Sequence, residues 1–409
     1  MSIVSNKAKE TTFQLAIGFF LLAAFLGALM RFIYLQEIPF LDYKYILHAH
    51  SHTAMLGWGF TALAGALVFS MLTKHRSMVP YRNALIVNTV AGLGMFITFL
   101  YQGYGALSIA FSTLHVFVAY YFSKHFLNDI KITPSSNAKI FAKWSVYLML
   151  LSTLGLWSIA PVGMLLGKLH PLYFASIQFF LHFQFNGWFM YGILALLFKH
   201  SENNGHAIKL PKYTFPILQT SVALTYALSI TWSTPENVLF YLNSVGVVLQ
   251  LLAFAMLLRG FLKNGKFDIP KGSIVYWLLL TGILSILFKI LMQSAVAITF
   301  IAQVSYTIRN FVIGFIHLIM LGGFSLTIIA LLLRQQILPT TTMALNGYRF
   351  LIIAFVLTEV ILFVQGILLW AEKGFLPLYY EVLFGITLLL PLSIILILTS
   401  SNSFKTETT

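Results

Sequence analysis

The sequence contains no cysteine among its 409 residues. This excludes disulfides, cysteine-ligated zinc, iron–sulfur clusters and a haem attached through a Cys-x-x-Cys-His motif. Charge is also scarce, since Asp, Glu, Lys and Arg make up 9% of the chain, whereas a soluble domain carries about 25%. So few charges cannot cover a water-facing surface of this size, and the sequence predicts an integral membrane protein.

Apolar residues are concentrated in twelve stretches, each close to the length of about 20 residues that a helix needs to cross a bilayer. The connections are short and polar, and none could form a separate soluble domain. The first stretch follows Lys7 and Lys9, and we expect it to be retained as a span rather than cleaved as a signal peptide. The sequence therefore predicts an all-α polytopic membrane protein with twelve transmembrane helices. The stretches lie at residues 12–35, 45–72, 84–102, 104–124, 142–165, 171–198, 214–233, 236–259, 273–300, 305–333, 346–370 and 378–400.

The 25 Lys and Arg residues exceed the 11 Asp and Glu, give a formal net charge of +14, and are unevenly distributed. Nineteen fall on the side that holds both termini, five on the other side, and Lys289 lies inside the ninth stretch. Because basic loops stay in the cytoplasm, we expect both termini to be cytoplasmic, in the inner (cytoplasmic) membrane. The charge thus indicates a lipid bilayer as partner, and no nucleic acid is expected. The nineteen are Lys7, Lys9, Lys74, Arg76, Arg82, Lys124, Lys131, Lys139, Lys143, Lys199, Lys209, Lys212, Arg259, Lys263, Lys266, Lys271, Arg334, Arg349 and Lys405.

Six of the eleven histidines lie inside the apolar stretches rather than at their ends. Ionisable residues at membrane depth are expensive, and they commonly mark ligands, proton paths or substrate sites. The stretches that carry them, the second, fourth, sixth and tenth, all run in the same direction. We therefore expect a band of histidines across the outer half of one helix bundle, either as ligands or as buried hydrogen-bonding residues. The six are His48, His50, His52, His115, His182 and His317.

Three of these histidines begin a repeated pattern of His, four residues and then Gly. The histidines are 130 and 135 residues apart, which corresponds to four stretches in each case. Equal spacing, direction and depth indicate three four-helix repeats within a single twelve-helix domain, residues 1–409. We place the repeats at residues 84–198, at 214–333, and in helix pairs near the two termini, the first ending at residue 73. The pattern pairs His52 with Gly57, His182 with Gly187, and His317 with Gly322.

Imidazole groups without thiolates suit haem iron or copper. One histidine from each of two facing helices can ligate a haem, and we expect His52 and His317 to form this pair. His48 lies four residues before His52 on the same helix face and would line the same cavity. The candidates for a second metal site or for hydrogen bonds are His182, His115 and His50.

Two cations are expected at the outer edge of the bilayer. Arg309 and Lys373 could hold haem propionates through charge-assisted hydrogen bonds. The alternative is that their long side chains simply reach the interface from nearby helix ends.

The segment from His48 to Gly57 resembles the His-x-His-x-x-Ala-x-x-Gly segments of cytochrome-cbb-type oxidases and nitric oxide reductases. These belong to the heme-copper oxidase superfamily, whose twelve spans and pseudo-threefold arrangement also resemble the pattern here. The resemblance implies a non-covalent b-type haem, with copper as the second metal. It also implies an electron donor such as a cytochrome or a quinol, or another oxidase subunit as partner.

The sequence departs from the catalytic members of this superfamily in two ways. Their similar segment lies in span ten, and they carry a His-His pair in span seven, whereas residues 214–233 contain no histidine. The chain resembles more loosely the twelve-span heme-and-copper membrane proteins of the nitric oxide response.

We expect a haem-binding protein that is involved in electron transfer, or in the chemistry of nitric oxide or oxygen or the response to them. The alternatives are a catalytic terminal oxidase or nitric oxide reductase subunit, and a secondary transporter with a structural histidine band. Whether the chain is an oxidoreductase acting on oxygen or nitric oxide stays open.

Overall fold

The structure, a computed structural model, describes residues 6–72, 77–265 and 268–403. Within these ranges the chain is helical and contains no strand. In the described part of the chain, ten helices are long and apolar enough to cross a membrane. The chain is therefore an all-α, multi-pass membrane protein. Some of the basic residues discussed above lie outside the described residues, namely Lys74, Arg76, Lys266 and Lys405.

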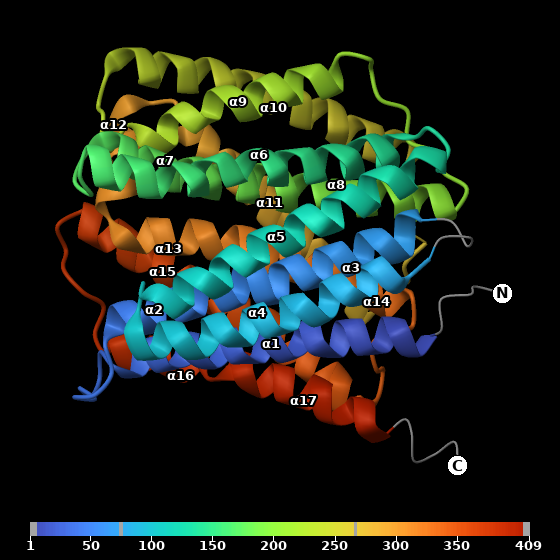
Figure 1. The fold of residues 1–409 in the computed structure, drawn as a ribbon, viewed down its shortest axis with the longest axis horizontal. Helices are drawn as coiled ribbons and strands as arrows, with labels where there is room; N and C mark the ends of the chain where they lie inside the picture. Colours follow the sequence, from blue (N-terminus) through green and yellow to red (C-terminus); the bar gives the residue numbers. More distant parts are fainter. Residues whose placement is uncertain (1–5, 73–76, 266–267, 404–409) are drawn as a thin grey trace. The chain divides into compact units, whose positions relative to one another are not determined.

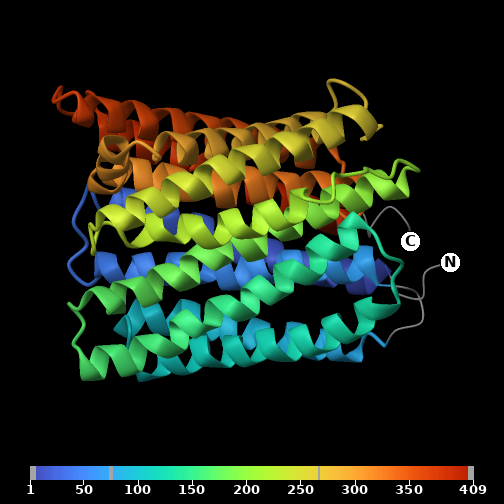
Figure 2. The same cartoon turned by 90° about the horizontal axis from the view of Figure 1, so that it is seen from above.

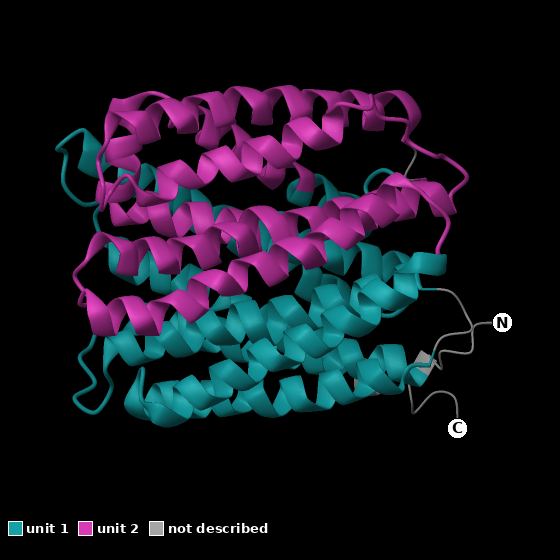
Figure 3. Cartoon of the chain, turned by 45° about the horizontal axis from the view of Figure 1, so that its top comes forward, with its two compact units in different colours: residues 1–132, 270–282, 321–409 teal, residues 133–269, 283–320 magenta. Residues whose placement is uncertain are grey.

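The chain divides into two compact units, which are coloured separately in Figure 3. Unit 1 comprises residues 1–132, 270–282 and 321–409, and unit 2 comprises residues 133–269 and 283–320. Two elements contribute residues to both units, the helix α11 (Ile274–Ala295) and the π-helix η4 (Leu318–Leu326). The single twelve-helix domain with threefold repeats stays a prediction.

Unit 1 brings the first and last helices of the chain together. Helix α1 packs along α17, and both lie at the lower side of Figure 1. The start of α1 and the end of α17 lie at the same end of this unit (Figure 1). Its helices are α1 (Asn6–Phe32), α2 (Tyr43–His52), η1 (Thr53–Gly59), α3 (Phe60–Met71), α4 (Val79–Gln102), α5 (Ala106–Asp129), η2 (Ile130–Ile132), α14 (Thr327–Arg334), α15 (Thr342–Trp370), α16 (Tyr379–Thr387) and α17 (Leu389–Ser403).

Unit 2 is built around two groups of neighbouring helices. Helices α9 and α10 lie side by side, as Figures 1 and 2 show, while α6 packs against α7, η3 and α8. Its helices are α6 (Asn137–Leu165), α7 (Pro171–His182), η3 (Phe183–Phe189), α8 (Met190–Asn203), α9 (Thr214–Ile230), α10 (Asn237–Asn264), α12 (Thr299–Thr307) and α13 (Arg309–His317).

Local sequence signals explain where several helices begin. The Asp42 carboxylate accepts hydrogen bonds from the backbone N–H groups of Lys44 at 2.7 Å and Tyr45 at 3.3 Å, which caps α2. Ser136 caps α6 in the same way, and Pro171 is the first residue of α7, where a missing N–H costs nothing.

Ten of the twelve expected spans correspond to the ten long apolar helices. The segment Pro171–Asn203 is helical throughout but is not among the ten. Its centre carries His182, Gln184 and Asn186, whose polarity lowers the mean hydropathy. The other exception is α9, an apolar helix of 17 residues that is shorter than any of the ten.

Candidate cofactor site

Each histidine of the sequence repeat is the last residue of an α-helix and is followed directly by a π-helix. The π-helices η1 and η3 have seven residues each, and η4 has nine. They are embedded in continuous helical segments, where π-helical turns are rare and frequently occur at functional sites. The repeat seen in the sequence is thus a repeat of backbone structure around His52, His182 and His317.

Two glycines of the repeat, Gly57 and Gly187, permit close helix contact. A Cβ atom on Gly57 would come within 2.8 Å of the Phe19 ring of α1. A Cβ atom on Gly187 would come within 2.6 Å of Cβ of Leu148 in α6. The π-helices η1 and η3 are therefore pressed against a neighbouring helix of their own unit.

Two of the histidine-bearing spans are the most buried of the ten. The most apolar windows of Tyr43–Met71 and Arg309–Arg334 are 78% and 83% buried, whereas the other eight are at most 50% buried. Inner helices of a bundle are where cofactor ligands are commonly placed.

His52 has the hydrogen-bonding arrangement of a metal ligand. Its Nδ1 atom lies 2.9 Å from the backbone oxygen of His48, and because a carbonyl only accepts, Nδ1 carries the proton. The lone pair is then on Nε2, as in metal-bound histidines whose other nitrogen donates to a carbonyl. The ring is half-buried and lies 4.2 Å from the Phe99 ring, centroid to centroid.

His48 lies on the same side of α2 as His52. Its ring centroid is 4.5 Å from that of Tyr104, which His52 also approaches at 5.8 Å. His50 faces α1 instead, where its Nδ1 donates to the backbone oxygen of Ala23 at 2.8 Å. The three histidines of α2 therefore lie in two different environments. Because Nδ1 of His50 carries the proton, its lone pair is on Nε2, as in His52.

His115 of α5 is held by an asparagine whose orientation is determined by its other contacts. The Asn88 amide nitrogen donates to the Leu56 carbonyl at 3.2 Å and to the Thr61 hydroxyl at 3.1 Å. Its oxygen therefore faces His115, whose Nδ1 lies 2.7 Å away and must be the donor. The lone pair of His115 is on Nε2, and Asn88 ties this ring to the π-helix η1 through Leu56.

His182 of unit 2 differs, because hydrogen bonds occupy both of its ring nitrogens. Nε2 donates to the backbone oxygen of Val222 in α9 at 2.8 Å, and Nδ1 accepts from the Asn186 amide at 3.3 Å. The Asn186 oxygen in turn accepts from the ammonium group of Lys289 at 2.6 Å. Lys289 is 1% exposed, so this is a fully buried polar network. A metal at His182 would have to displace one of these hydrogen bonds.

The remaining predicted residues lie at helix ends. His317 ends α13 and is half-buried, and Arg309 begins the same helix, eight residues earlier, with an exposed side chain. Lys373 follows α15 and is exposed, while its backbone N–H donates to the Leu368 carbonyl at 2.8 Å.

The structure brings His48, His52, His50 and His115 into unit 1 and places His182 in unit 2 with Asn186 and Lys289. Sequence analysis missed Asn88 and linked neither Asn186 nor Lys289 to His182. In the described part of the chain, no three His, Asp or Glu side chains are grouped as a metal site would require. A second metal site stays a prediction.

Comparison with known proteins places the fold. No family model matches the chain, and no curated protein matches it. A solved structure of a heme-copper terminal oxidase, determined as a dimer by cryo-EM, matches with a TM-score of 0.60 at 13% identity. The match covers 95% of this chain and 81% of the oxidase chain. The class defined by these findings is therefore a polytopic helical membrane protein that shares the fold of this oxidase chain.

Proposed function

We propose that the chain is a haem-binding membrane protein of the heme-copper oxidase superfamily that handles electrons. The observation that carries the proposal is His52, a half-buried imidazole at an α-to-π junction with its lone pair on Nε2. The fold shared with a heme-copper terminal oxidase supports the choice of cofactor. Bound non-covalently, a b-type haem would supply one-electron redox chemistry.

His52 is the first proposed axial ligand, because its Nδ1–H is anchored to the carbonyl of its own helix. That hydrogen bond fixes the ring orientation and raises the basicity of Nε2. The pairing with His317 rests on the repeat and on the π-helix that follows each histidine. His48 would line the same cofactor, and Arg309 and Lys373 would hold its propionates.

Copper is the proposed second metal. His115 and His50 each have a lone pair on Nε2, and an imidazole lone pair suits copper. His182 would join them only after releasing Val222 or Asn186.

The proposed topology has twelve spans in three four-helix repeats. The segment Pro171–Asn203 and helix α9 would supply the two crossings beyond the ten long apolar helices. With the basic loops inside, both termini would be cytoplasmic, in the inner membrane. A cytochrome, a quinol or another oxidase subunit would exchange electrons with the haem.

The optical spectrum of the purified protein tests the proposal. After expression with a supply of haem, we expect a Soret band, an increase of the b-type α band on adding dithionite, and iron in a metal count. A protein that carries no Soret band under these conditions would refute haem binding.

A second candidate is a catalytic subunit that reduces oxygen or nitric oxide. The likeness to a terminal oxidase favours it, while the lack of histidine in residues 214–233 opposes it. Consumption of oxygen or nitric oxide by the purified protein with an artificial electron donor would establish catalysis. A loaded protein that consumes neither gas fits electron transfer or a response role.

A further inference from the structure

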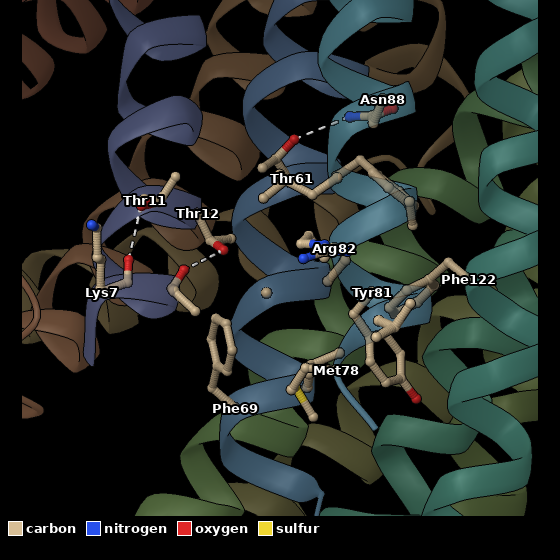
Figure 4. Close-up of a pocket in the computed structure, with 18 residues that line it drawn as sticks. Lys7, Thr11, Thr12, Thr61, Phe69, Met78, Tyr81, Arg82, Asn88 and Phe122 are labelled. Carbon is tan, nitrogen blue, oxygen red and sulfur yellow. Dashed lines mark hydrogen bonds between the residues drawn. The ribbon is translucent and has the colours of Figure 1, made fainter. Parts of the chain in front are cut away.

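Unit 1 contains a pocket at the end where α1 and α4 begin and α3 and α5 finish. Its volume is about 580 Å³, within the usual range for small-molecule sites of about 300–1,000 Å³. We call it the α1–α4 pocket, and Figure 4 shows the side chains that line it, including Lys7, Phe69, Arg82 and Phe122.

The charge in the α1–α4 pocket is entirely positive among the described residues. Lys7 and Arg82 line it, and no described lining residue is acidic. Figure 4 shows the Arg82 side chain near the middle of the labelled lining residues. Lys9 adds a third cation at the rim, with its nitrogen 6.0 Å from the centre of the Phe69 ring.

Three hydroxyl groups of the pocket already donate hydrogen bonds within the protein. Thr11 donates to the Lys7 carbonyl and Thr12 to the Ala8 carbonyl, both at 2.8 Å, and Tyr81 donates to the Asp129 carboxylate at 2.7 Å. The Arg82 guanidinium and the Lys7 ammonium have no hydrogen-bond or ion-pair partner in the described part of the chain. These two side chains are therefore the charged donors that a ligand would meet, and both select an anion.

The rest of the α1–α4 pocket is apolar. Its largest apolar lining residues are Phe60, Val68, Phe69, Met78 and Phe122. The pocket also lies at the ends of membrane-spanning helices, because Lys7 is the first residue of one span and Arg82 is the fourth of another. The ends of membrane-spanning helices lie at the level of the lipid phosphate groups, and the acyl chains extend from there into the bilayer core.

We propose that the α1–α4 pocket binds an anionic phospholipid. The lipid phosphate contacts Arg82 and Lys7, and the first part of an acyl chain lies against Val68, Phe69 and Phe122. An anionic phospholipid thus offers both a negative group for the two cations and an acyl chain for the apolar wall. A free anion lacks the acyl chain, and a lipid without net charge lacks the negative charge. This site is independent of haem binding.

The test is lipid binding to the purified full-length protein, measured by native mass spectrometry during titration with phosphatidylglycerol or phosphatidylcholine. We expect phosphatidylglycerol to bind more tightly. Each cation near a lipid phosphate contributes about a fivefold change in affinity, so Arg82→Gln weakens phosphatidylglycerol about fivefold. Arg82→Gln combined with Lys7→Gln removes the preference.

Two further variants distinguish the effect of charge from the effect of the space within the α1–α4 pocket. Arg349→Gln makes the same charge change in α15, where the side chain contacts Asn346 rather than the pocket, and it should leave binding unchanged. Ala8→Trp places a large ring at an exposed lining position and should weaken binding without altering charge.

Several results would overturn the proposal. Equal affinity for the two lipids would do so, as would equal losses in Arg82→Gln and Arg349→Gln. Displacement of phosphatidylglycerol by millimolar inorganic phosphate would identify a site for free anions instead of lipid.

Discussion

The junction of α2 with η1 and the junction of α7 with η3 have the same backbone structure, but a different ring nitrogen of the histidine donates to a carbonyl in each. In the first, a carbonyl four residues back on the same helix holds the Nδ1 atom of His52. In the second, the carbonyl of Val222 on α9 holds Nε2 of His182, and Asn186 occupies Nδ1. The same α-to-π junction thus carries an imidazole hydrogen-bonded to a carbonyl through Nδ1 in unit 1, and one with both nitrogens hydrogen-bonded in unit 2.

The difference shows that position along the helix does not decide what a buried histidine can do. The neighbours decide it, because they determine which nitrogen keeps a lone pair and whether anything can reach it. A further charged group, Lys289, joins the second junction through Asn186. Substitutions of the two histidines, or of the residues that hydrogen-bond to them, should therefore have different effects on bound haem and on stability.

The largest expected effect is on bound haem. His52→Ala should reduce haem per protein to near zero, because the variant loses the proposed axial ligand. His182→Ala should retain haem, since that ring is held by protein groups. Haem content by pyridine haemochrome measures both, with His125→Ala in α5 as a control for removing any histidine. Equal losses in the two variants would contradict the proposed distinction.

The second effect is on the stability of unit 2. Asn186→Leu leaves the buried Lys289 ammonium and the His182 ring without their partner, which should lower the free energy of unfolding by about 3 kcal/mol. Lys289→Met should cost less, because it removes the charge itself. Thermal unfolding in detergent measures each variant.

The double variant Asn186→Leu with Lys289→Met supplies the control for this network. It should be more stable than Asn186→Leu alone, because no buried charge is left behind. If the two substitutions simply added, the proposed coupling would be wrong.

A smaller effect compares the glycines of the two junctions. Gly187→Ala and Gly57→Ala should each cost about 1–3 kcal/mol, because the new methyl groups would approach Leu148 and Phe19 too closely. Chemical denaturation of each variant gives the loss, and an unaltered midpoint for both would mean that η1 and η3 are not pressed against their neighbours.

The smallest effect has the opposite sign. Gly18 of α1 has nothing within 4 Å of the position of an added Cβ. Gly18→Ala should therefore raise stability by up to about 1 kcal/mol through helix propensity. Measured beside Gly57→Ala, it separates the crowding of a junction from the general effect of replacing a helical glycine.

Much of the architecture could be predicted from the sequence. Ten spans follow from runs of apolar residues, because hydrophobicity over about 20 residues is a local property. The two exceptions have local causes as well, since α9 is short and polar residues interrupt Pro171–Asn203. The histidine repeat was visible because its spacing is regular.

The details of the site could not be predicted. A π-helix has no sequence period of its own and depends on packing, such as that of Gly57 against Phe19. The partner of His115 lies 27 residues away in the chain, and Lys289 lies 103 residues from Asn186. Such contacts arise only when distant helices meet, so the choice of ring nitrogen is a tertiary property.

The most direct test is rescue by free imidazole. In His52→Gly supplied with haem, added imidazole should restore the low-spin absorption spectrum, because it takes the place of the missing Nε2 ligand. In His182→Gly, imidazole should leave the spectrum unchanged. Rescue in His182→Gly and not in His52→Gly, or the same response in both, would contradict the assignment of His52 as the ligand.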